Sequence, residues 1–266
     1  GEMHLRDVSM LAPQKWAGRI VVPFCPESLL SGVRKRVSEQ QALWYRRRFT
    51  LPADWRTEGV DLHFGAVDWE TFVWVNGKAV SGGPHRGGYD PFSYRIGHLL
   101  KADGENEIIV RVWDPTDTGA QPRGKQVQDP HGIWYTPVTG IWQSVWLEQV
   151  RMPSISNLKI TPDIDAGHVR IEFAAGLEHK QPPAVPVRVI VRDGTQVIAE
   201  GTTTTVEGRG RLELSIPNAR LWSPDDPFLY DLELRVSQPD GDVVRSYFGM
   251  RKISIGPDAG GRLRML

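Results

Sequence analysis

The residues best suited to binding lie in one long polar segment, 121–135. Its side chains include the cations Arg123 and Lys125, the amides of three glutamines and the carboxylate of Asp129, and it ends in Trp134 and Tyr135. Long loops without secondary structure of their own are uncommon in compact domains and usually serve a function. A loop so rich in charged and amide groups is expected to meet a partner.

A second, smaller group of candidate residues lies about 35 positions before this segment, at 85–89. Two adjacent glycines, Gly87 and Gly88, let the backbone bend sharply while His85, Arg86 and Tyr89 keep large side chains beside the bend. The simpler interpretation is a hairpin connection in which His85 and Tyr89 hydrogen-bond to the backbone. Both interpretations stay open at this point.

No sequence pattern supports a catalytic metal site, a nucleotide-binding loop or a catalytic nucleophile. Five histidines show no ligand spacing with one another, with Cys25 or with clustered acids: His63, His98, His131, His168 and His179. The sequence has no phosphate-binding glycine loop and no Gly-x-Ser-x-Gly elbow. The apolar neighbours of Cys25 favour an inert buried thiol. A structural calcium at the turn of Asp114 and Asp117 is a minor alternative, so we predict no catalytic metal and no cofactor.

Charge and length exclude two classes of partner. The 266 residues carry 32 Lys and Arg against 32 Asp and Glu, so no net field attracts nucleic acid or an anionic membrane. No apolar run approaches the roughly 20 residues that cross a bilayer. The start, Gly1-Glu2-Met3, has no signal-peptide hydrophobic region. The compartment stays open between cytoplasmic and, with a signal removed, secreted or periplasmic.

Short strands are the elements that must position these residues. In the first half, five runs are aromatic or β-branched and bounded by Gly, Pro, Asp or Asn: 43–49, 60–64, 71–75, 107–113 and 144–147. The run ending at Val75 stops at Asn76-Gly77, a dipeptide typical of tight hairpin turns. Only 27–36 hints at a turn of helix. The pattern predicts an antiparallel sandwich over residues 1–150, with most tryptophans, including Trp44, Trp69, Trp74, Trp142 and Trp146, packed in the core.

A second set of strand-like runs begins after residue 150. Seven further strand-like runs follow within about a hundred residues: 155–160, 169–173, 187–192, 196–205, 211–216, 229–236 and 243–248. Asp193-Gly194 and Asp240-Gly241 mark hairpin turns. This number and spacing predict an immunoglobulin-like sandwich over 151–256 without the disulfide of antibody domains. The glycine-rich stretch 257–266 is expected to be a linker.

Several motifs in a fixed order resemble the N-terminal domains of glycoside hydrolase family 2, the β-galactosidase, β-glucuronidase and β-mannosidase group. They are Pro23-Phe24-Cys25-Pro26, Trp44-Tyr45-Arg46, Phe64-Gly65-Ala66-Val67-Asp68, Val73-Trp74-Val75-Asn76-Gly77, His85 to Phe92, Gly132 to Val145, Leu221 to Tyr230 and Phe248-Gly249-Met250-Arg251. The resemblance implies an all-β chain, with a galactose-binding-like jelly-roll sandwich followed by the immunoglobulin-like one. It covers most of the sequence.

The resemblance also implies where catalysis should and should not lie. In the family a (β/α)₈ barrel carries two catalytic glutamates, and no βαβ alternation exists here to build one. Retaining hydrolysis needs two carboxyl groups about 5 Å apart. Asp68 and Glu70 would share a strand face if extended, but their neighbours indicate a core-facing run. We therefore expect no catalytic residue in this chain, and its standing as an enzyme stays uncertain.

The resemblance gives the polar segment a role. In the family the corresponding loop leans over the barrel beside the terminal sugar. Arg123, Gln126 and Asp129 would then supply hydrogen bonds and Trp134 a stacking face. The other reading is a solvated loop that docks against the barrel without touching sugar. His85, Arg86 and Tyr89 are carried as further substrate-binding candidates.

The start of the chain departs from the family pattern. The expected first strand is not recognisable before Ile20, and its loss would expose a sheet edge. We expect that edge to be covered by residues 4–16 or paired with another chain as a homo-oligomer.

Four functions follow in order of preference. The first is the non-catalytic front portion of a β-galactosidase-like enzyme, which shapes the sugar pocket and braces the barrel. The second is a free-standing protein that binds a β-glycoside. The third is a structural or adhesion module without a ligand, and the fourth is a small glycosidase that uses carboxylates of the sandwiches.

Overall fold

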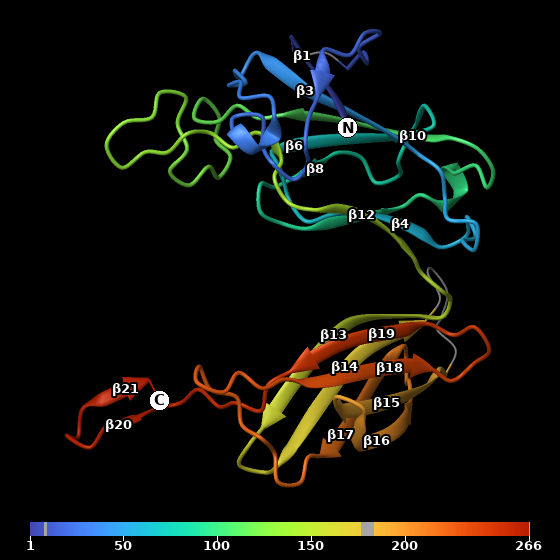
Figure 1. Cartoon of the computed structure of the whole chain (residues 1–266), viewed down its shortest axis with the longest axis vertical. Coiled ribbons are helices and arrows are strands. Elements are labelled where there is room, and N and C mark those ends of the chain that lie inside the picture. Colours follow the sequence, from blue (N-terminus) through green and yellow to red (C-terminus); the bar gives the residue numbers. More distant parts are fainter. Residues whose placement is uncertain (8–9, 177–183, 266) are drawn as a thin grey trace. The chain divides into compact units, whose positions relative to one another are not determined.

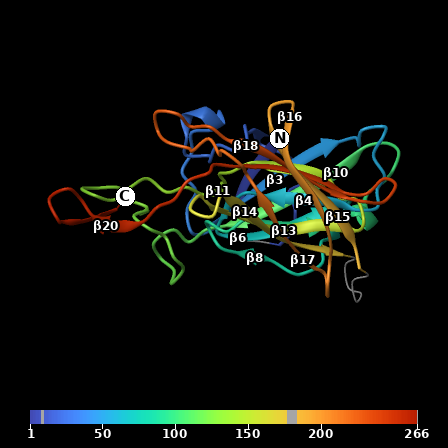
Figure 2. The same ribbon diagram turned by 90° about the horizontal axis from the view of Figure 1, so that it is seen from below.

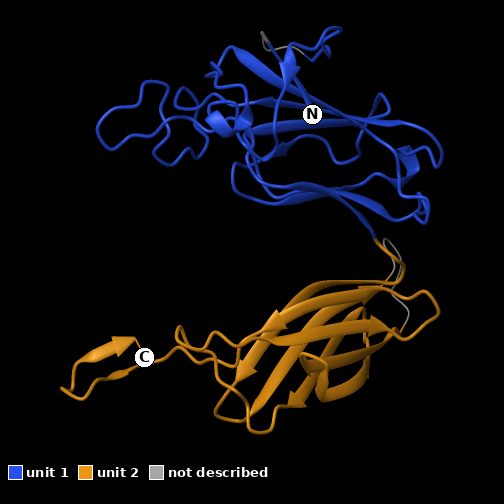
Figure 3. Ribbon diagram, in the orientation of Figure 1, with its two compact units in different colours: residues 1–149 blue, residues 150–266 orange. Residues whose placement is uncertain are grey.

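The computed structural model describes residues 1–7, 10–176 and 184–265. They form two compact units, Gly1–Gln149 and Val150–Leu266, whose regular elements are antiparallel strands apart from two 3-10 turns (Figure 3). All twelve predicted runs coincide with strands to within three residues at each end. Residues 27–36 contain a single 3-10 turn, η1 (Leu29–Ser31), and a second one, η2 (Gly97–Leu99), lies further on. Among the described residues, no helix has the length and apolar character of a membrane span.

The first unit is a sandwich of one large and one small sheet. The large sheet has the order β2-β1-β3-β10-β6-β7, with β8 also pairing with β6, and the small sheet has the order β12-β4-β9. The strands of the large sheet are β1 (Glu2–Asp7), β2 (Gly18–Arg19), β3 (Gln41–Phe49), β6 (Glu70–Val75), β7 (Lys78–Ala79), β8 (His85–Arg86) and β10 (Asn106–Trp113). Those of the small sheet are β4 (Val60–Phe64), β9 (Phe92–Arg95) and β12 (Val145–Gln149), and β5 (Val67–Asp68) pairs with β11 (Gly140–Ile141).

Alternation along the strands builds the core of this unit. In β4, Val60, Leu62 and Phe64 are buried while Asp61 and His63 face outward. The inward side chains of the two sheets form one apolar cluster with Leu43, Tyr45, Val73 and Val110 among its members. Every second residue of β4 and β6 is buried, as the period-two pattern predicts, whereas the central strand β3 buries four consecutive residues.

The hairpin between β6 and β7 turns at Asn76 and Gly77, with φ of +49° and +78°. Positive φ at both positions is the geometry that favours Asn-Gly. The Asn76 side chain also donates to the carbonyl of Leu99 and to Asn106 Oδ1, and accepts from the N–H of Glu107. One asparagine therefore shapes the turn and ties it to the start of β10.

The chain's own N-terminus covers the sheet edge, as the first of the two expectations had it. Residues of β1 pair in register along β3, from Glu2 opposite Arg46 to Asp7 opposite Gln41, and β2 pairs with β1 in turn. The pairing segment begins at Glu2, slightly earlier than the expected residues 4–16. The strand was missed because its inward-facing pattern is short and contains no aromatic residue.

The second unit is a seven-stranded sandwich of the immunoglobulin-like type. One sheet has the order β13-β14-β17 and the other β16-β15-β18-β19. Their bounds are β13 (Ser154–Asp163), β14 (His168–Gly176), β15 (Pro186–Asp193), β16 (Gln196–Thr204), β17 (Arg209–Ser215), β18 (Tyr230–Val236) and β19 (Val243–Phe248). A second apolar cluster fills the space between the sheets and shares no residue with the first.

A hairpin stands where the sequence predicted a linker. Strands β20 (Ile255–Pro257) and β21 (Leu263–Met265) pair beside the sandwich of their unit (Figure 1). Asp258 Oδ1 accepts from the N–H groups of Gly260 and Arg262, and its Oδ2 accepts from Arg264. The carboxylate organises the glycine turn, so this stretch is ordered locally.

Candidate functional site

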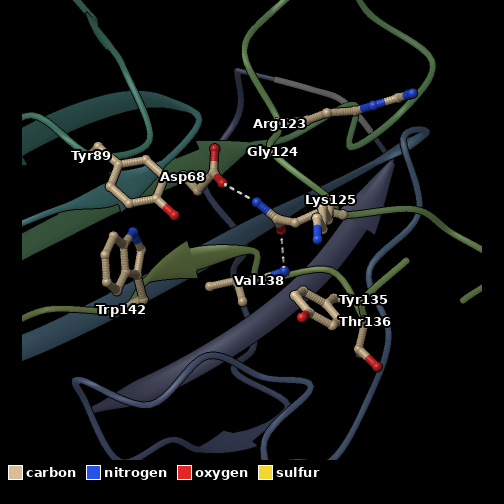
Figure 4. Close-up of a pocket in the computed structure, with 10 residues that line it drawn as sticks. Asp68, Tyr89, Arg123, Gly124, Lys125, Tyr135, Thr136, Val138 and Trp142 are labelled. Atoms are coloured by element: carbon tan, nitrogen blue, oxygen red, sulfur yellow. Dashed lines mark hydrogen bonds between the residues drawn. The ribbon is translucent and has the colours of Figure 1, made fainter. Parts of the chain in front are cut away.

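The long polar loop extends from the strands of the first unit (green in Figures 1 and 2) and borders a pocket. The cavity has a volume of about 270 Å³. Its lining residues are Asp68, Tyr89, Arg123, Gly124, Lys125, Gln126, Tyr135, Thr136, Val138 and Trp142 (Figure 4). Asp68 ends β5, Tyr89 follows β8, and Trp142 follows β11. Segments far apart in the sequence therefore meet at one end of the sandwich.

Gln126 joins the loop to the sheet through both atoms of its amide. Its Nε2 donates to Asp68 Oδ2 at 3.1 Å, and its Oε1 accepts from the backbone N–H of Val138 at 2.5 Å (Figure 4). Asp68 also packs tightly against Gly88, because a Cβ on that glycine would lie 2.7 Å from Asp68 Oδ1. A side chain at position 88 would displace the carboxyl group from its place.

Three buried carboxyl groups support this end of the sandwich. Burial raises the pKa of Asp68, although the Gln126 hydrogen bond opposes the shift, and burial likewise raises the pKa of Glu27. The pKa of Asp114 rises to about 7, chiefly through burial and then through the charges of Asp68 and Glu27, while hydrogen bonds from Thr116 oppose the rise. The protonated forms are favoured because water cannot solvate the charges.

The loop is held by backbone pairing and by a second glutamine. The N–H of Val127 donates to the carbonyl of Tyr135, and the N–H of Tyr135 donates to the carbonyl of Lys125. Gln128 Nε2 donates to the carbonyl of Val37 and to Thr116 Oγ1. These bonds fix the stem of the loop, so the lining residues have defined positions.

Aromatic rings form one wall of the pocket. Tyr89 meets Trp142 edge-to-face with ring centroids 5.3 Å apart, and Trp142 Nε1 donates to the carbonyl of Gly88 at 2.7 Å. Tyr89 is 75% exposed and Tyr135 is 63% exposed. Open aromatic rings beside cations, an amide and a carboxyl group suit a ligand with both apolar faces and hydroxyl groups.

Comparison with known proteins places most of the chain in one family. The sequence model for "Glycosyl hydrolases family 2, sugar binding domain" matches residues 33–151, and that for "Glycosyl hydrolases family 2" matches residues 154–251. The chain belongs to glycoside hydrolase family 2. Its two sandwiches are the N-terminal, non-catalytic domains of that family.

The family 2 relatives are longer proteins. A β-glucuronidase of Felis catus is 31% identical over 80% of this chain, which covers 36% of that protein. A β-galactosidase of Thermoanaerobacter pseudethanolicus is 25% identical over 81% of the chain, which covers 29% of it. The chain thus spans about a third of the length of these relatives.

Solved family 2 structures share the fold. A β-glucuronidase from Ruminococcus gnavus in complex with D-glucuronic acid aligns over 96% of this chain and 47% of its own, with a TM-score of 0.67 and 19% identity. A β-glycosidase from Bacteroides vulgatus aligns over 98% of this chain and 34% of its own, with a TM-score of 0.65 and 21% identity. The likeness establishes that this chain has the same fold as the matching parts of these structures.

Three of the seven substrate-binding candidates line the pocket: Tyr89, Arg123 and Gln126. Arg123 extends away from Asp68 (Figure 4), its Nη1 donates to the carbonyl of Asp117, and its guanidinium lies 5.8 Å from the centre of the Trp134 ring. The three come from two different loops, as the sequence grouping had them.

The structure places the other four candidates outside the lining. Trp134 is half-buried against Arg123, and Asp129 is exposed with its carbonyl 2.7 Å from His131 Nδ1. His85 stacks on Phe92 with centroids 3.9 Å apart and its Nε2 lies 3.3 Å from the carbonyl of Gly87. Arg86 forms an ion pair with Glu70. A sugar role for these four stays a prediction.

Asp68 is the site residue that sequence reasoning set aside. A shared strand face with Glu70 required an extended run over 68–70, but β5 ends at Asp68 and β6 begins at Glu70, so their carboxyl groups part. Asp68 points to Gln126 and Glu70 points to Arg86. Trp142 was likewise assigned to the core. The available signal was a lone acid in an apolar run, a position that burial makes costly without a partner.

The histidines, Asp114 and Cys25 form no metal or nucleophile site in the described part of the chain. Among the described residues, no group of three or more His, Cys, Asp or Glu side chains could hold a metal ion; His179 lies outside that part of the chain. Asp114 is buried and accepts from the N–H of Thr116 rather than facing open solvent. Cys25 is half-buried, and desolvation followed by the charge of Glu27 raises its pKa, which disfavours the thiolate.

Proposed function

We propose that this chain forms the non-catalytic front portion of a family 2 β-glycosidase, and that the pocket of Asp68, Gln126 and Trp142 is one wall of its terminal-sugar site. The observation that supports this most directly is the pocket itself. It combines open aromatic rings with hydrogen-bonding groups within the stretch that matches the family's sugar binding domain.

The lining offers the contacts that a sugar ring requires. The rings of Tyr89 and Trp142 can pack on C–H faces, and Arg123 and Lys125 supply donors for hydroxyl or carboxylate oxygens. Because Gln126 is already bonded to Asp68 and Val138, it fixes the wall rather than the ligand. Recognition would therefore fall mainly to the aromatic and cationic side chains.

Bond cleavage is assigned to carboxylates outside this chain. Of the acids near the loop, only Asp68 lines the cavity; Asp114 does not, and Glu70 is paired with Arg86. A hydrolytic pair needs two carboxyl groups flanking one bond, with one of them ionised. The cavity provides a single carboxyl group, that of Asp68, whose pKa is raised by burial. The barrel that the family resemblance implies would supply the pair.

The test uses the polypeptide encoded by the whole source gene, assayed on 4-nitrophenyl β-D-galactoside and β-D-glucuronide. Tyr89→Ala removes an exposed ring from the wall, so kcat/KM should fall about fivefold or more, the equivalent of about 1 kcal/mol of lost contact. Tyr247→Ala is the matched control, because Tyr247 is 65% exposed on β19 of the other unit. It should leave kcat/KM unchanged.

Residues 1–266 alone should release no nitrophenol from either substrate. Turnover by this purified chain that disappears in Asp68→Asn would overturn the proposal. An unchanged kcat/KM in Tyr89→Ala of the longer polypeptide would remove the pocket from the sugar site.

A further inference from the structure

The small sheet of the first unit carries an exposed tryptophan that the core does not use. Trp146 lies on β12 with its side chain on the outer face, and it is 46% exposed. Its sequence setting predicted a core residue. Opposite it across the strands lie His63 on β4 and Ser93 on β9. An open indole in the middle of a strand is a large apolar surface left to solvent.

The geometry leaves one face of this indole covered and the other open. The His63 ring stacks on Trp146 with centroids 4.9 Å apart and planes 11° from parallel. Strand β12 is the edge of its sheet, whose order is β12-β4-β9, and Figure 1 shows it beside β4. A flat ring placed against the outer side of Trp146 would therefore continue the stack that His63 begins.

Polar groups lie beside the aromatic pair on the same outer face. Glu148 follows Trp146 by two residues, and its Oε2 lies 3.0 Å from His63 Nε2 while its side chain remains 56% exposed. In the next row, Asp61 pairs with Arg95. These groups can exchange hydrogen bonds with hydroxyls at the rim of a ring stacked on the indole.

We propose that Trp146 and Glu148 form a carbohydrate-binding surface separate from the pocket, and that its ligand is a neutral β-linked oligosaccharide. A β-linked chain of equatorially substituted pyranoses presents flat C–H faces that suit an open indole. The platform contacts only one side of a ring, so repeated units along a chain fit it better than a single sugar held in a cavity.

The charges of the surface favour a neutral ligand. The surface carries two carboxylates, those of Asp61 and Glu148, and one guanidinium, that of Arg95. The guanidinium is paired with Asp61. A uronic-acid chain would bring further negative charge to this face and be repelled. The cavity described above contains Arg123 and Lys125 instead, and shares no residue with this surface. The two sites therefore differ in charge as well as in shape, and neither proposal requires the other.

The experiment uses uniformly ¹⁵N-labelled residues 1–266 titrated with cellohexaose and with β-1,4-linked xylohexaose. The indole N–H signal that disappears in Trp146→Phe is assigned to Trp146. At least one of the two neutral probes should shift this signal saturably, with a dissociation constant at least about fivefold lower than for tetragalacturonate. Trp146→Ala should abolish binding measured by calorimetry.

Two matched variants separate recognition from folding. Glu148→Gln should weaken binding about twofold to tenfold, on the scale of one ordinary net hydrogen bond, with an unchanged unfolding midpoint. Tyr247→Ala, which removes an exposed ring on β19 outside both proposed sites, should bind the hexasaccharides as the unmodified chain does. Because Trp146 is exposed, its replacement should not unfold the chain, and circular dichroism checks this.

Other occupants of the surface would be recognised by different results. No shift of the Trp146 signal with either neutral probe overturns the proposal, and so does tighter binding of tetragalacturonate. A shift that depends on protein concentration, with a dimer mass by light scattering and no response to sugar, would assign the edge of β12 to a second copy of the chain instead. Equal binding in Trp146→Ala would place the sugar elsewhere.

Discussion

At the scale of single residues, Gln126 connects the polar loop to the buried carboxyl group of Asp68. Replacing it with alanine leaves Asp68 Oδ2 and the N–H of Val138 without their described partners. A buried polar group that loses its hydrogen bond costs about 1–3 kcal/mol. We expect Gln126→Ala to lower the free energy of unfolding of the first unit by about that amount.

Denaturant unfolding followed by tryptophan fluorescence measures this loss, because nine of the ten tryptophans lie in residues 1–149. Gln143→Ala is the control, since Gln143 is exposed. Equal free energies of unfolding in the two variants would mean that the loop is not held through Gln126.

Asp114 makes the stability of the first unit depend on pH. Its pKa is about 7 in the folded chain, against 3.8 as the ordinary value. Between these values the folded chain binds more protons than the unfolded one, so the free energy of unfolding falls as pH rises from about 4 to about 7. Above that range the contribution is constant. Asp68 and Glu27, whose pKa values are also raised, act in the same direction.

Asp114→Asn keeps an acceptor for the N–H of Thr116 and removes the titration. We expect the loss of unfolding free energy between pH 5 and pH 8 to be smaller in this variant than in the unmodified chain, by roughly 1–3 kcal/mol. Parallel denaturant titrations at the two pH values test it. Asp163→Asn, whose carboxyl pKa is lowered by hydrogen bonds from the N–H groups of Ala166 and Asp165, should leave the difference as it is. Identical pH dependence with and without Asp114 would contradict the expectation.

At the scale of elements, β1 keeps the backbone of β3 from becoming an unpaired edge of the large sheet. It covers the backbone of β3 from residue 41 to residue 46. Deleting residues 1–17 would expose these N–H and C=O groups, and unpaired strand edges associate with other strands. We expect this truncation to form dimers or larger species at concentrations where the full chain is monomeric.

Size-exclusion chromatography with light scattering gives the mass of each form. Deletion of residues 258–266 is the control at the other terminus, because it removes one strand of an exposed hairpin and uncovers no strand of either sandwich. A monomeric N-terminal truncation with native fluorescence would show that β1 is dispensable.

At the scale of the whole molecule, the chain has two separate cores. The cluster around Leu43, Leu62 and Val110 belongs to the first unit, and the cluster around Ile171, Val189 and Leu234 belongs to the second. A domain with its own core can fold alone. Residues 1–149 and 150–266, produced separately, should each unfold cooperatively.

Circular dichroism of the two pieces measures this directly. In the intact chain, the fluorescence transition should follow the first unit, since Trp222 is the one tryptophan of the second. The dichroism transition should report both units and need not coincide with it. A piece that remains unfolded on its own would show that its core depends on the other.

The sequence alone determined twelve of the strands, the Asn76-Gly77 turn and the family. Period-two alternation at 60–64 and positive-φ turn residues at 76–77 act over a few neighbours, so their outcome can be read locally. Motif order then sufficed to recognise the two sandwiches, because it lies along the chain.

Tertiary structure alone decided which of these side chains face one another. Gln126 reaches Asp68 across 58 residues, and β1 reaches β3 across about 40. Alternation says that Trp146 and Leu147 point to opposite faces of a strand, but not which face another layer covers. Burial is a property of the assembled sheets. The pocket beside Asp68, the pairing of β1 with β3 and the exposure of the Trp146 indole therefore depend on how the sheets assemble.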